Sequence, residues 1–329
     1  VTRSSAMART TSTQPQGPAS TSPLLDSLGP LLADGSLLAG SEAPALYGAD
    51  ETETQGVKGR PDAVALPAST AEVATVMRWC YEHDVPLVPR GGGTGFSGGA
   101  VPINGGVVLS LERLTAIRAF DPGYWRMHVE AGVTTADLRR RCRENGLFFP
   151  PDPGAAEQSQ IGGNIATNAG GPHAFKYGVT GSWVTGLEAV VPPGEVVEVG
   201  GPIRKDVAGY DLKSLLIGSE GTLGVITAAW LRLLPAPEAF LPVVAFYPDA
   251  QAGCGVIEDV LAAGLEAATL EYLDGRTLEA AGGAYPAGVP EGADFMVLSE
   301  ADGGAEDAAG LRDELVEVLA PNAVSVLSP

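Results

Sequence analysis

The chain is poor in cysteine, histidine and basic residues. It has three cysteines and three histidines in 329 residues, with no CxxC pair and no histidine at metal-ligand spacing. A metal site is therefore not expected, and we interpret Cys80, Cys142 and Cys254 as buried or inert thiols. Twenty basic residues stand against forty acidic ones, a formal charge of −20. A surface of this charge repels nucleic acid, so no nucleic-acid partner is expected.

Long apolar runs are also missing. No stretch approaches the roughly 18 apolar residues that a membrane helix needs, so no transmembrane segment is expected. Residues 1–23 are rich in Ser, Thr and Pro, show no clear amphipathic period and lack the apolar region of a signal peptide. We therefore expect a disordered tail over residues 1–40 and a cytoplasmic location. The chain is long enough to hold two domains.

Strand and helix patterns alternate from residue 63 onward. A capping box at Ser69, followed by apolar residues at helical spacing, predicts one helix. Thr134-Thr-Ala-Asp137 opens another that runs to about Asn145, and a third is expected over 250–263. Short apolar runs predict strands over 63–66, 85–89, 107–111, 187–191, 196–199, 225–234, 243–246 and 271–274. The remainder after residue 274 is rich in Ala and Gly, so the region from 238 onward reads as a second domain that opens and then stops.

The sharpest local feature is the glycine loop Arg90-Gly-Gly-Gly-Thr-Gly95, which continues to Gly99. Glycines allow positive φ and carry no Cβ atom, so successive backbone N–H groups can converge on one anion, such as a pyrophosphate. A flexible turn between two strands is the alternative. No Lys-Ser/Thr pair follows, which excludes a P-loop. A strand follows in place of a helix, which argues against a Rossmann NAD site.

Two further segments consist of small residues. Residues 161–171 contain almost no side chain larger than Asn, apart from Ile, as backbone lying against a large planar ligand requires. The Asn and Thr residues there can bond to a ring edge. Gly218-Ser-Glu-Gly-Thr-Leu-Gly224 again suits a close backbone approach, with Glu220 as an acceptor from hydroxyls. A structural turn is the alternative for both, and it explains the second segment almost as well.

Six ordered motifs resemble the FAD-binding domain of the vanillyl-alcohol oxidase and p-cresol methylhydroxylase (PCMH) superfamily. They are Val88–Gly95, Pro150–Pro153, Ile161–Gly171, Lys176–Thr180, Lys205–Leu212 and Gly218–Gly224. Within that superfamily they are similar to the glycolate oxidase large-subunit and D-lactate dehydrogenase branch. The resemblance implies an α+β, PCMH-type FAD-binding domain of two subdomains over residues 41–237, with FAD in the cleft between them. It further implies a cap (substrate) domain over residues 238–329.

The resemblance also implies which residues contact the cofactor. Gly91–Gly95 would hold the pyrophosphate, residues between 159 and 170 would line the flavin ring and ribityl chain, and Glu220 with Val225 would meet the nucleotide end. The full set is Arg90, Gly91, Gly92, Gly93, Thr94, Gly95, Ser97, Pro151, Ser159, Ile161, Gly162, Gly163, Asn164, Ala166, Thr167, Asn168, Gly170, Glu220, Gly224, Val225 and Ile226.

Two positions depart from relatives of this kind. Covalent relatives carry His at the fifth position of the glycine loop, where this chain has Thr94, so the FAD is expected to be non-covalent. Gln160 stands where this branch usually has Thr, directly before the Ile-Gly-Gly-Asn sequence.

By the same resemblance, the chain is an FAD-dependent oxidoreductase. It would oxidise a small 2-hydroxy acid (glycolate, D-lactate or 2-hydroxyglutarate type) by hydride transfer to flavin N5, and a protein or a quinone would accept the electrons. The family's Trp-x-x-Arg-Glu and His-x-Gly-Asp-Gly-Asn-x-His segments, which would hold the substrate carboxylate and supply the base, occur nowhere in this sequence. The cap domain is therefore expected to be incomplete, and no catalytic residue is assigned. The alternatives are a non-catalytic FAD-binding or electron-transfer subunit and a truncated, inactive relative.

A few side chains near the expected flavin ring invite a substrate role. His173 is the only histidine there, and a role as the base is one hypothesis. Lys176-Tyr177 and Lys205-Asp206 could pair with a substrate carboxylate, but we favour structural pairs on the surface or between subdomains.

Overall fold

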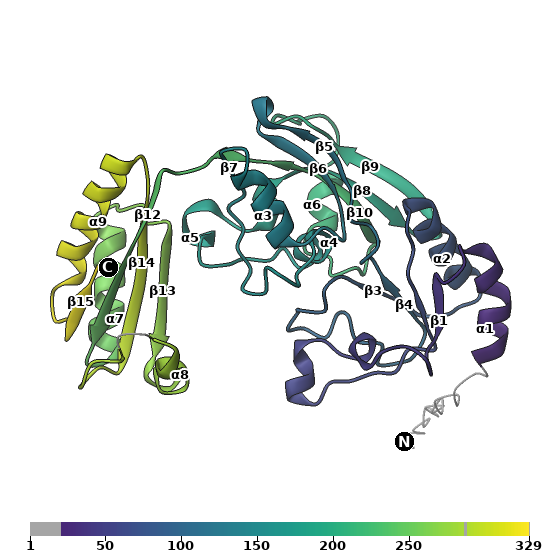
Figure 1. Cartoon of the computed structure of the whole chain (residues 1–329), viewed down its shortest axis with the longest axis horizontal. Helices are drawn as coiled ribbons and strands as arrows, with labels where there is room; N and C mark the ends of the chain where they lie inside the picture. Colours follow the sequence, from purple (N-terminus) through teal and green to yellow (C-terminus); the bar gives the residue numbers. More distant parts are fainter. Residues whose placement is uncertain (1–20, 286–287, 329) are drawn as a thin grey trace, which may run out of the picture.

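The computed structural model describes residues 21–285 and 288–328. In this part there are three larger sheets and a two-stranded one: two of the larger sheets lie side by side, and the third is set apart from them, reached through one extended segment near residue 236 (Figure 1). No helix among these residues is long and apolar enough to span a bilayer. The mixture of helix and sheet confirms the predicted α+β fold class.

The N-terminal sheet has the strand order β1-β2-β4-β3, with β2, β4 and β3 parallel. Its strands are β1 (Leu37–Ala39), β2 (Ala63–Ala65), β3 (Leu87–Arg90) and β4 (Val107–Ser110). Helices α1 (Thr21–Leu28) and α2 (Thr70–Glu82) pack on one face of it. Because β3 and β4 are parallel, the chain must cross back between them. The glycine loop therefore leaves the carboxyl end of β3.

Ser69 and Thr134 are the N-caps of α2 and α3, while the Glu72 carboxylate of the predicted capping box accepts from the Ala68 N–H at 2.7 Å rather than from the N-cap amide. The Ser69 hydroxyl accepts a hydrogen bond from the Glu72 N–H at 3.2 Å, and that of Thr134 accepts one from the Asp137 N–H at 3.1 Å. Each bond satisfies a free amide in the first helical turn. Cys80 lies on the buried face of α2, where burial raises the pKa of its thiol to about 12.

Regular structure begins earlier than the sequence predicts. Helix α1 starts at Thr21, Leu28 is fully buried against α2 and its sheet, and β1 pairs with β2. The predicted disorder is therefore wrong from residue 21 to residue 40, and residues 1–20 lie outside the described part. Composition gave the wrong prediction because α1 is stabilised by the burial of a few leucines, and these are few in a segment rich in Ser and Pro.

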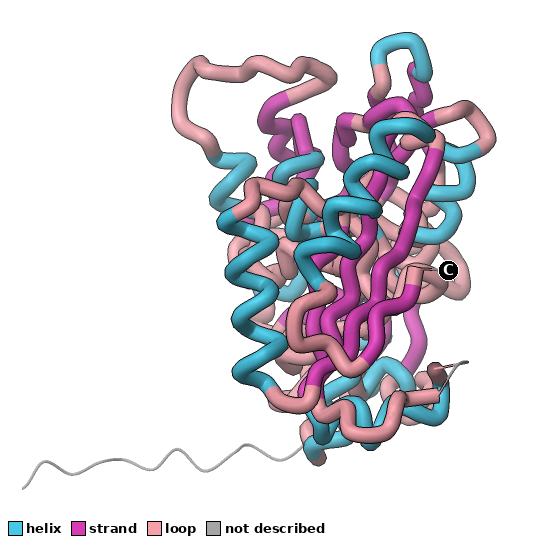
Figure 2. The backbone as a smooth tube through the Cα atoms, turned by 90° about the vertical axis from the view of Figure 1, so that its left-hand side faces the viewer, coloured by secondary structure: helices cyan, strands magenta, loops and turns pink. Residues whose placement is uncertain are grey.

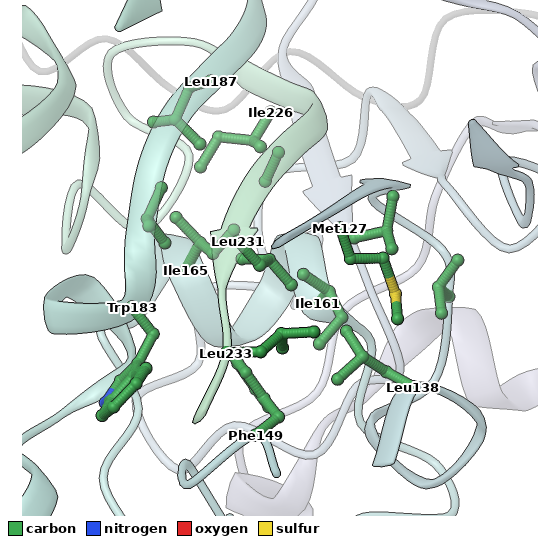
Figure 3. Packing of buried hydrophobic residues seen from close by; sticks show 14 of the residues in the cluster. Met127, Leu138, Phe149, Ile161, Ile165, Trp183, Leu187, Ile226, Leu231 and Leu233 are labelled. Carbon is green, nitrogen blue, oxygen red and sulfur yellow. The ribbon is translucent and has the colours of Figure 1, made fainter. Parts of the chain in front are cut away.

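The middle sheet is antiparallel, with the order β5-β6-β10-β8-β9. Its strands are β5 (Ile117–Asp121), β6 (Arg126–Glu130), β8 (Val184–Val191), β9 (Glu195–Gly200) and β10 (Val225–Arg232). The shorter elements are α3 (Thr135–Arg143), β7 (Leu147–Phe148), α4 (Ile161–Ala166), α5 (Ala174–Tyr177), α6 (Leu212–Leu216) and β11 (Leu234–Pro235), which pairs with β7. Figure 3 shows Ile161 and Ile165 of α4 packed near Leu231 of β10 in the core of this unit.

The C-terminal sheet is also antiparallel, with the order β13-β14-β12-β15. Its elements are β12 (Ala239–Tyr247), α7 (Ala250–Ala262), β13 (Thr269–Asp274), α8 (Gly275–Ala281), β14 (Phe295–Gly303), α9 (Ala305–Leu319) and β15 (Ser325–Leu327). Helices α7 and α9 cover one face, as Figure 2 shows from the side. The sequence patterns did not predict β14 and α9. In α9 the apolar face is interrupted by Ala, Gly and acidic residues, which weakens the helical pattern.

Candidate cofactor-binding site

A cavity of about 620 Å³ lies between the N-terminal and middle sheets. Its walls come from the glycine loop after β3, from the segment around α4 and from the turn before β10. Most of the residues predicted from the sequence line it: Arg90, Gly91, Gly92, Gly93, Thr94, Gly95, Ser97, Gly162, Gly163, Asn164, Ala166, Thr167, Gly170, Glu220, Gly224, Val225 and Ile226. Three segments far apart in the sequence thus meet at one cavity.

The glycines of the loop meet different surroundings. A Cβ atom on Gly92 would stand 2.0 Å from the backbone oxygen of Gln158, and Gly93 has a φ of +72°. Both positions therefore exclude a side chain for reasons internal to the protein. A Cβ atom on Gly95 would meet no protein atom within 4 Å, although Gly95 lines the cavity. Gly95 thus leaves open the space that a ligand would occupy.

Arg90 carries positive charge to the base of the loop. It is 5% exposed, and its Nη1 donates a hydrogen bond to the carbonyl oxygen of Ala49 at 2.6 Å. Its Nη2 lies 2.0 Å from where a Cβ atom of Gly93 would stand. Burial lowers the pKa of Arg90 and the charge of Asp50 opposes that shift. An arginine remains protonated in proteins, so a positive charge lies next to the glycine loop.

One side-chain hydrogen bond connects the two walls of the cavity. Ser97 Oγ in the glycine loop donates to Glu220 Oε2 at 2.8 Å. Glu220 has a φ of +50°, an uncommon conformation for a residue with a side chain, and its N–H donates to the Ala166 carbonyl at 2.8 Å. The turn before β10 is therefore tied both to the glycine loop and to the end of α4.

Pro151, Ser159, Ile161 and Asn168 were also predicted to contact the cofactor, but the structure does not place them on the cavity wall. Ile161 is fully buried in the core, and the other three are buried or support the wall from behind. Ser159 Oγ shares a 2.8 Å hydrogen bond with Thr135, which accepts one from Asn164 Nδ2 at 2.7 Å. Asn168 Oδ1 accepts from the Gly181 N–H at 2.8 Å.

The sequence reading did not select several residues that line the cavity, among them Asp50, Phe96 and Ala155. Gln160, which the sequence marks only as a departure from relatives, lines the cavity too, and its buried Oε1 has no hydrogen-bond partner among the described residues. Asp50 is 7% exposed; its Oδ1 accepts from the Thr52 N–H, while its Oδ2 has no hydrogen-bond partner in the part of the chain that the structure describes. Buried polar atoms are rarely left unpaired, so both side chains offer acceptors to a ligand.

His173 lies outside the cavity wall and between two carboxylates. Its Nε2 is 2.9 Å from Glu300 Oε2, and its Nδ1 is 2.7 Å from Asp152 Oδ2. Burial works to lower the pKa of His173, but the two acidic partners outweigh it and raise the pKa to about 9. The ring is then protonated at neutral pH and cannot accept a proton. The hypothesis that His173 is a catalytic base is not supported.

Lys176 and Tyr177 are also engaged by the C-terminal sheet. Lys176 Nζ pairs with Asp302 Oδ1 at 2.5 Å, and the Tyr177 hydroxyl donates to the other oxygen of the same carboxylate. Burial and Asp302 raise the pKa of Tyr177. These contacts support the structural interpretation of Lys176-Tyr177. Lys205-Asp206 lies on an exposed loop and does not line the cavity.

Comparison with known proteins agrees with this geometry. Residues 61–200 match the family described as FAD binding domain. This part of the chain is thus similar to an FAD-binding domain. Similar curated proteins include a glycolate oxidase subunit, D-lactate dehydrogenases and D-2-hydroxyglutarate dehydrogenases. It is 42% identical over 250 residues to the glycolate oxidase subunit GlcD of Bacillus subtilis (strain 168), a match that covers 76% of this chain and 53% of that protein.

Two further relatives show the same pattern. The D-lactate dehydrogenase of Anaerostipes hadrus is 37% identical (72% of this chain, 50% of that protein), and the D-2-hydroxyglutarate dehydrogenase of Stutzerimonas stutzeri (strain A1501) is 38% identical (69% and 48%). The chain spans about half the length of these curated relatives. A solved structure of alkyldihydroxyacetonephosphate synthase superposes with a TM-score of 0.79 at 20% identity, covering 94% of this chain and 61% of that one. That last likeness concerns the fold.

Proposed function

We propose that the chain binds FAD non-covalently in the cavity between its first two sheets and serves the oxidation of a small 2-hydroxy acid. The observation that carries the proposal is the glycine loop over Arg90, open toward the cavity at Gly95. Backbone N–H groups that converge above a buried cation suit a pyrophosphate. The strand that follows this loop is inconsistent with a Rossmann NAD site.

The remaining wall residues fit the rest of such a cofactor. Asn164 and Thr167 lie on or beside α4 and can bond to a polar ring edge, while Gly163 leaves room for it: a Cβ atom there would meet only the Gly91 Cα, at 3.9 Å. Glu220, at the other wall, can accept hydrogen bonds from ribose hydroxyls. The unpaired oxygens of Gln160 and Asp50 can accept from ligand N–H or O–H groups. We propose that all the predicted residues contribute to FAD binding. Those on the cavity wall would contact the cofactor, and Pro151, Ser159, Ile161 and Asn168 would support the wall.

FAD, when bound, supplies a two-electron acceptor, and the protein supplies orientation and electrostatics. Arg90 offsets the charge of the pyrophosphate, and the cavity shields the ring from water. Thr94 stands where covalent relatives carry His, and its hydroxyl offers no imidazole for a flavin link. The bound cofactor is therefore expected to dissociate when the protein unfolds.

The substrate class follows from the relatives, whose names give glycolate, D-lactate and D-2-hydroxyglutarate. One observation favours the alternative of an FAD-binding subunit whose partner supplies the substrate groups. His173 and Lys176 follow Gly170, a cavity-wall residue, closely in the sequence. The carboxylates of Asp152, Glu300 and Asp302 already pair with these two cations. Neither cation is free to hold a substrate carboxylate. The electron acceptor, whether a protein or a quinone, belongs to the same proposal.

A single preparation tests these points in order. The purified chain is titrated with FAD, and the visible flavin spectrum and the quenching of flavin fluorescence report binding. Acid precipitation then separates the two modes of attachment: non-covalent FAD stays in the supernatant, and covalent flavin sediments with the protein. Absence of saturable FAD binding would overturn the proposal.

Substrate oxidation is tested on the FAD-loaded protein. D-lactate, glycolate and D-2-hydroxyglutarate are added under anaerobic conditions, and bleaching of the flavin band is followed. Bleaching by one of them supports the oxidoreductase. Stable flavin with no bleaching by any of the three supports the FAD-binding subunit and removes the catalytic half of the proposal for this chain.

A further inference from the structure

A second, basic pocket lies at the far end of the middle sheet. It has a volume of about 160 Å³ and is lined by Tyr124, Trp125, Arg126, Thr185, Pro202, Ile203, Arg204 and Arg232. Arg232 and Val225 are the two ends of β10, and Val225 lines the FAD cavity. At about 3.3 Å per residue, the two sites lie roughly 23 Å apart. The pocket is therefore separate from the flavin site.

The three arginines are poorly neutralised. Arg126 and Arg232 lie directly opposite each other on the neighbouring strands β6 and β10, an arrangement that is unfavourable for like charges. Arg126 pairs with Asp121 at 3.1 Å, yet its buried Nε finds no hydrogen-bond partner within residues 21–285 and 288–328. Within the described residues, Arg204 and Arg232 have no carboxylate in ion-pair distance, and no acidic residue lines the pocket. This is unusual in a chain with twice as many acidic as basic residues.

Aromatic rings hold the guanidinium groups in place. Arg204 lies over the ring of Trp125 at 5.1 Å, and Arg232 lies over the ring of Trp183 at 4.4 Å. Arg232 Nε also donates to the Ser182 carbonyl at 2.7 Å, which leaves its terminal nitrogens for other partners. Stacked guanidinium groups are pre-organised to bind an oxyanion through paired N–H donors. Burial, followed by the charge of Arg204, lowers the pKa of Arg232, as expected where cations face each other.

We propose that this pocket binds an oxyanion, the phosphate or carboxylate group of a small ligand, through Arg204 and Arg232. The small volume favours one such group, and the charge of −20 disfavours a large acidic protein as the occupant. Binding an anion would remove the repulsion between the arginines. The inference stands independently of the hydroxy-acid chemistry.

The test uses the full chain saturated with FAD, so that the glycine loop is occupied. Orthophosphate and succinate are titrated separately by calorimetry at constant ionic strength. We expect saturable binding of at least one of them, and a loss of affinity of tenfold or more in Arg204→Gln and Arg232→Gln. Arg204→Lys keeps the charge without the paired donors and should retain part of the affinity. Arg140→Gln, which removes an exposed arginine that pairs with Asp137, is the matched control and should bind as the parent does.

Each outcome decides the matter. Binding of phosphate alone or succinate alone names the group, and binding of both assigns a general oxyanion site. Absence of saturable binding, or equal affinity in Arg204→Gln and the parent, overturns the proposal. Near-ultraviolet circular dichroism and FAD affinity show that the variants are folded. If the chain fails to take up FAD, the parent and Arg204→Gln still share an unchanged glycine loop, so their difference reports on this pocket alone.

Discussion

His173 and Glu300 form a contact between the cavity-forming unit (residues 21–237) and the C-terminal sheet, with Nε2 of His173 2.9 Å from Oε2 of Glu300. Asp152 flanks the other ring nitrogen at 2.7 Å, and Lys176 pairs with Asp302 close by on β14. The imidazolium thus sits between acids from both units. Ion pairs therefore join the C-terminal sheet to the cavity-forming unit, in addition to the chain segment before β12.

The first prediction concerns the pH dependence of this contact. The folded-state pKa of His173, about 9, lies above the unfolded value of roughly 6.5. The stabilisation is therefore fully present below pH ~6.5 and is lost as pH rises to about 9, because the unfolded chain gives up its proton first. Its full size is up to about 3 kcal/mol. Denaturant unfolding of the parent and of His173→Gln should show a difference in free energy that shrinks over this range. A difference independent of pH would contradict the assignment.

The second prediction concerns Asp302. Its side chain is fully buried and receives both Lys176 and the Tyr177 hydroxyl. Asp302→Ala would leave the ammonium without its partner, and we expect a loss of stability of about 2–4 kcal/mol, since removal of one member of a buried pair is costly. Glu271→Gln, an exposed acid on the neighbouring strand β13, is the control. Equal unfolding midpoints for the two variants would show that this contact contributes nothing.

Sequence patterns predicted those parts of the fold that depend on local chemistry. The capped helices α2 and α3 and the strand after the glycine loop have local signals, and the structure contains them. Helix α4 lies within the small-residue segment, where propensity disfavours a helix, and it forms because Ile161 and Ile165 are buried against β10. Tertiary packing overrides propensity there.

The candidate site was predictable to the same extent. A glycine-rich loop indicates that another group approaches the backbone closely, so Gly92 and Gly95 could be predicted from the sequence. Whether Ile161 faces the core or the ligand depends on the direction of one short helix, which spacing alone does not give. Asp50 carries no motif of its own, and only the fold brings it beside the loop. Glu300 and Asp302, which pair with His173 and Lys176, lie more than 120 residues away in the chain.

The third prediction separates space needed by the protein from space needed by the ligand. Gly95→Ala adds a Cβ atom that meets no protein atom, so the fold should persist while FAD affinity falls by about tenfold or more. Gly310→Ala makes the same chemical change on the exposed side of α9, also in open space, and should raise stability by about 0.5–1 kcal/mol with unchanged FAD affinity. Fluorescence titration with FAD measures both. Full FAD affinity in Gly95→Ala would place the cofactor elsewhere.

The last prediction is that one substitution at Gln160 raises the stability of the FAD-free protein and lowers its affinity for FAD. Gln160 Oε1 is buried on the cavity wall without a partner, which destabilises the protein until a ligand donates to it. Gln160→Met has a similar shape and no polar atom to satisfy. We expect this variant to be more stable than the parent without FAD, by about 1 kcal/mol, and to bind FAD about tenfold more weakly. Thermal unfolding without FAD and titration with FAD give the two quantities. A variant that gains or loses both together would show that Gln160 does not meet the cofactor.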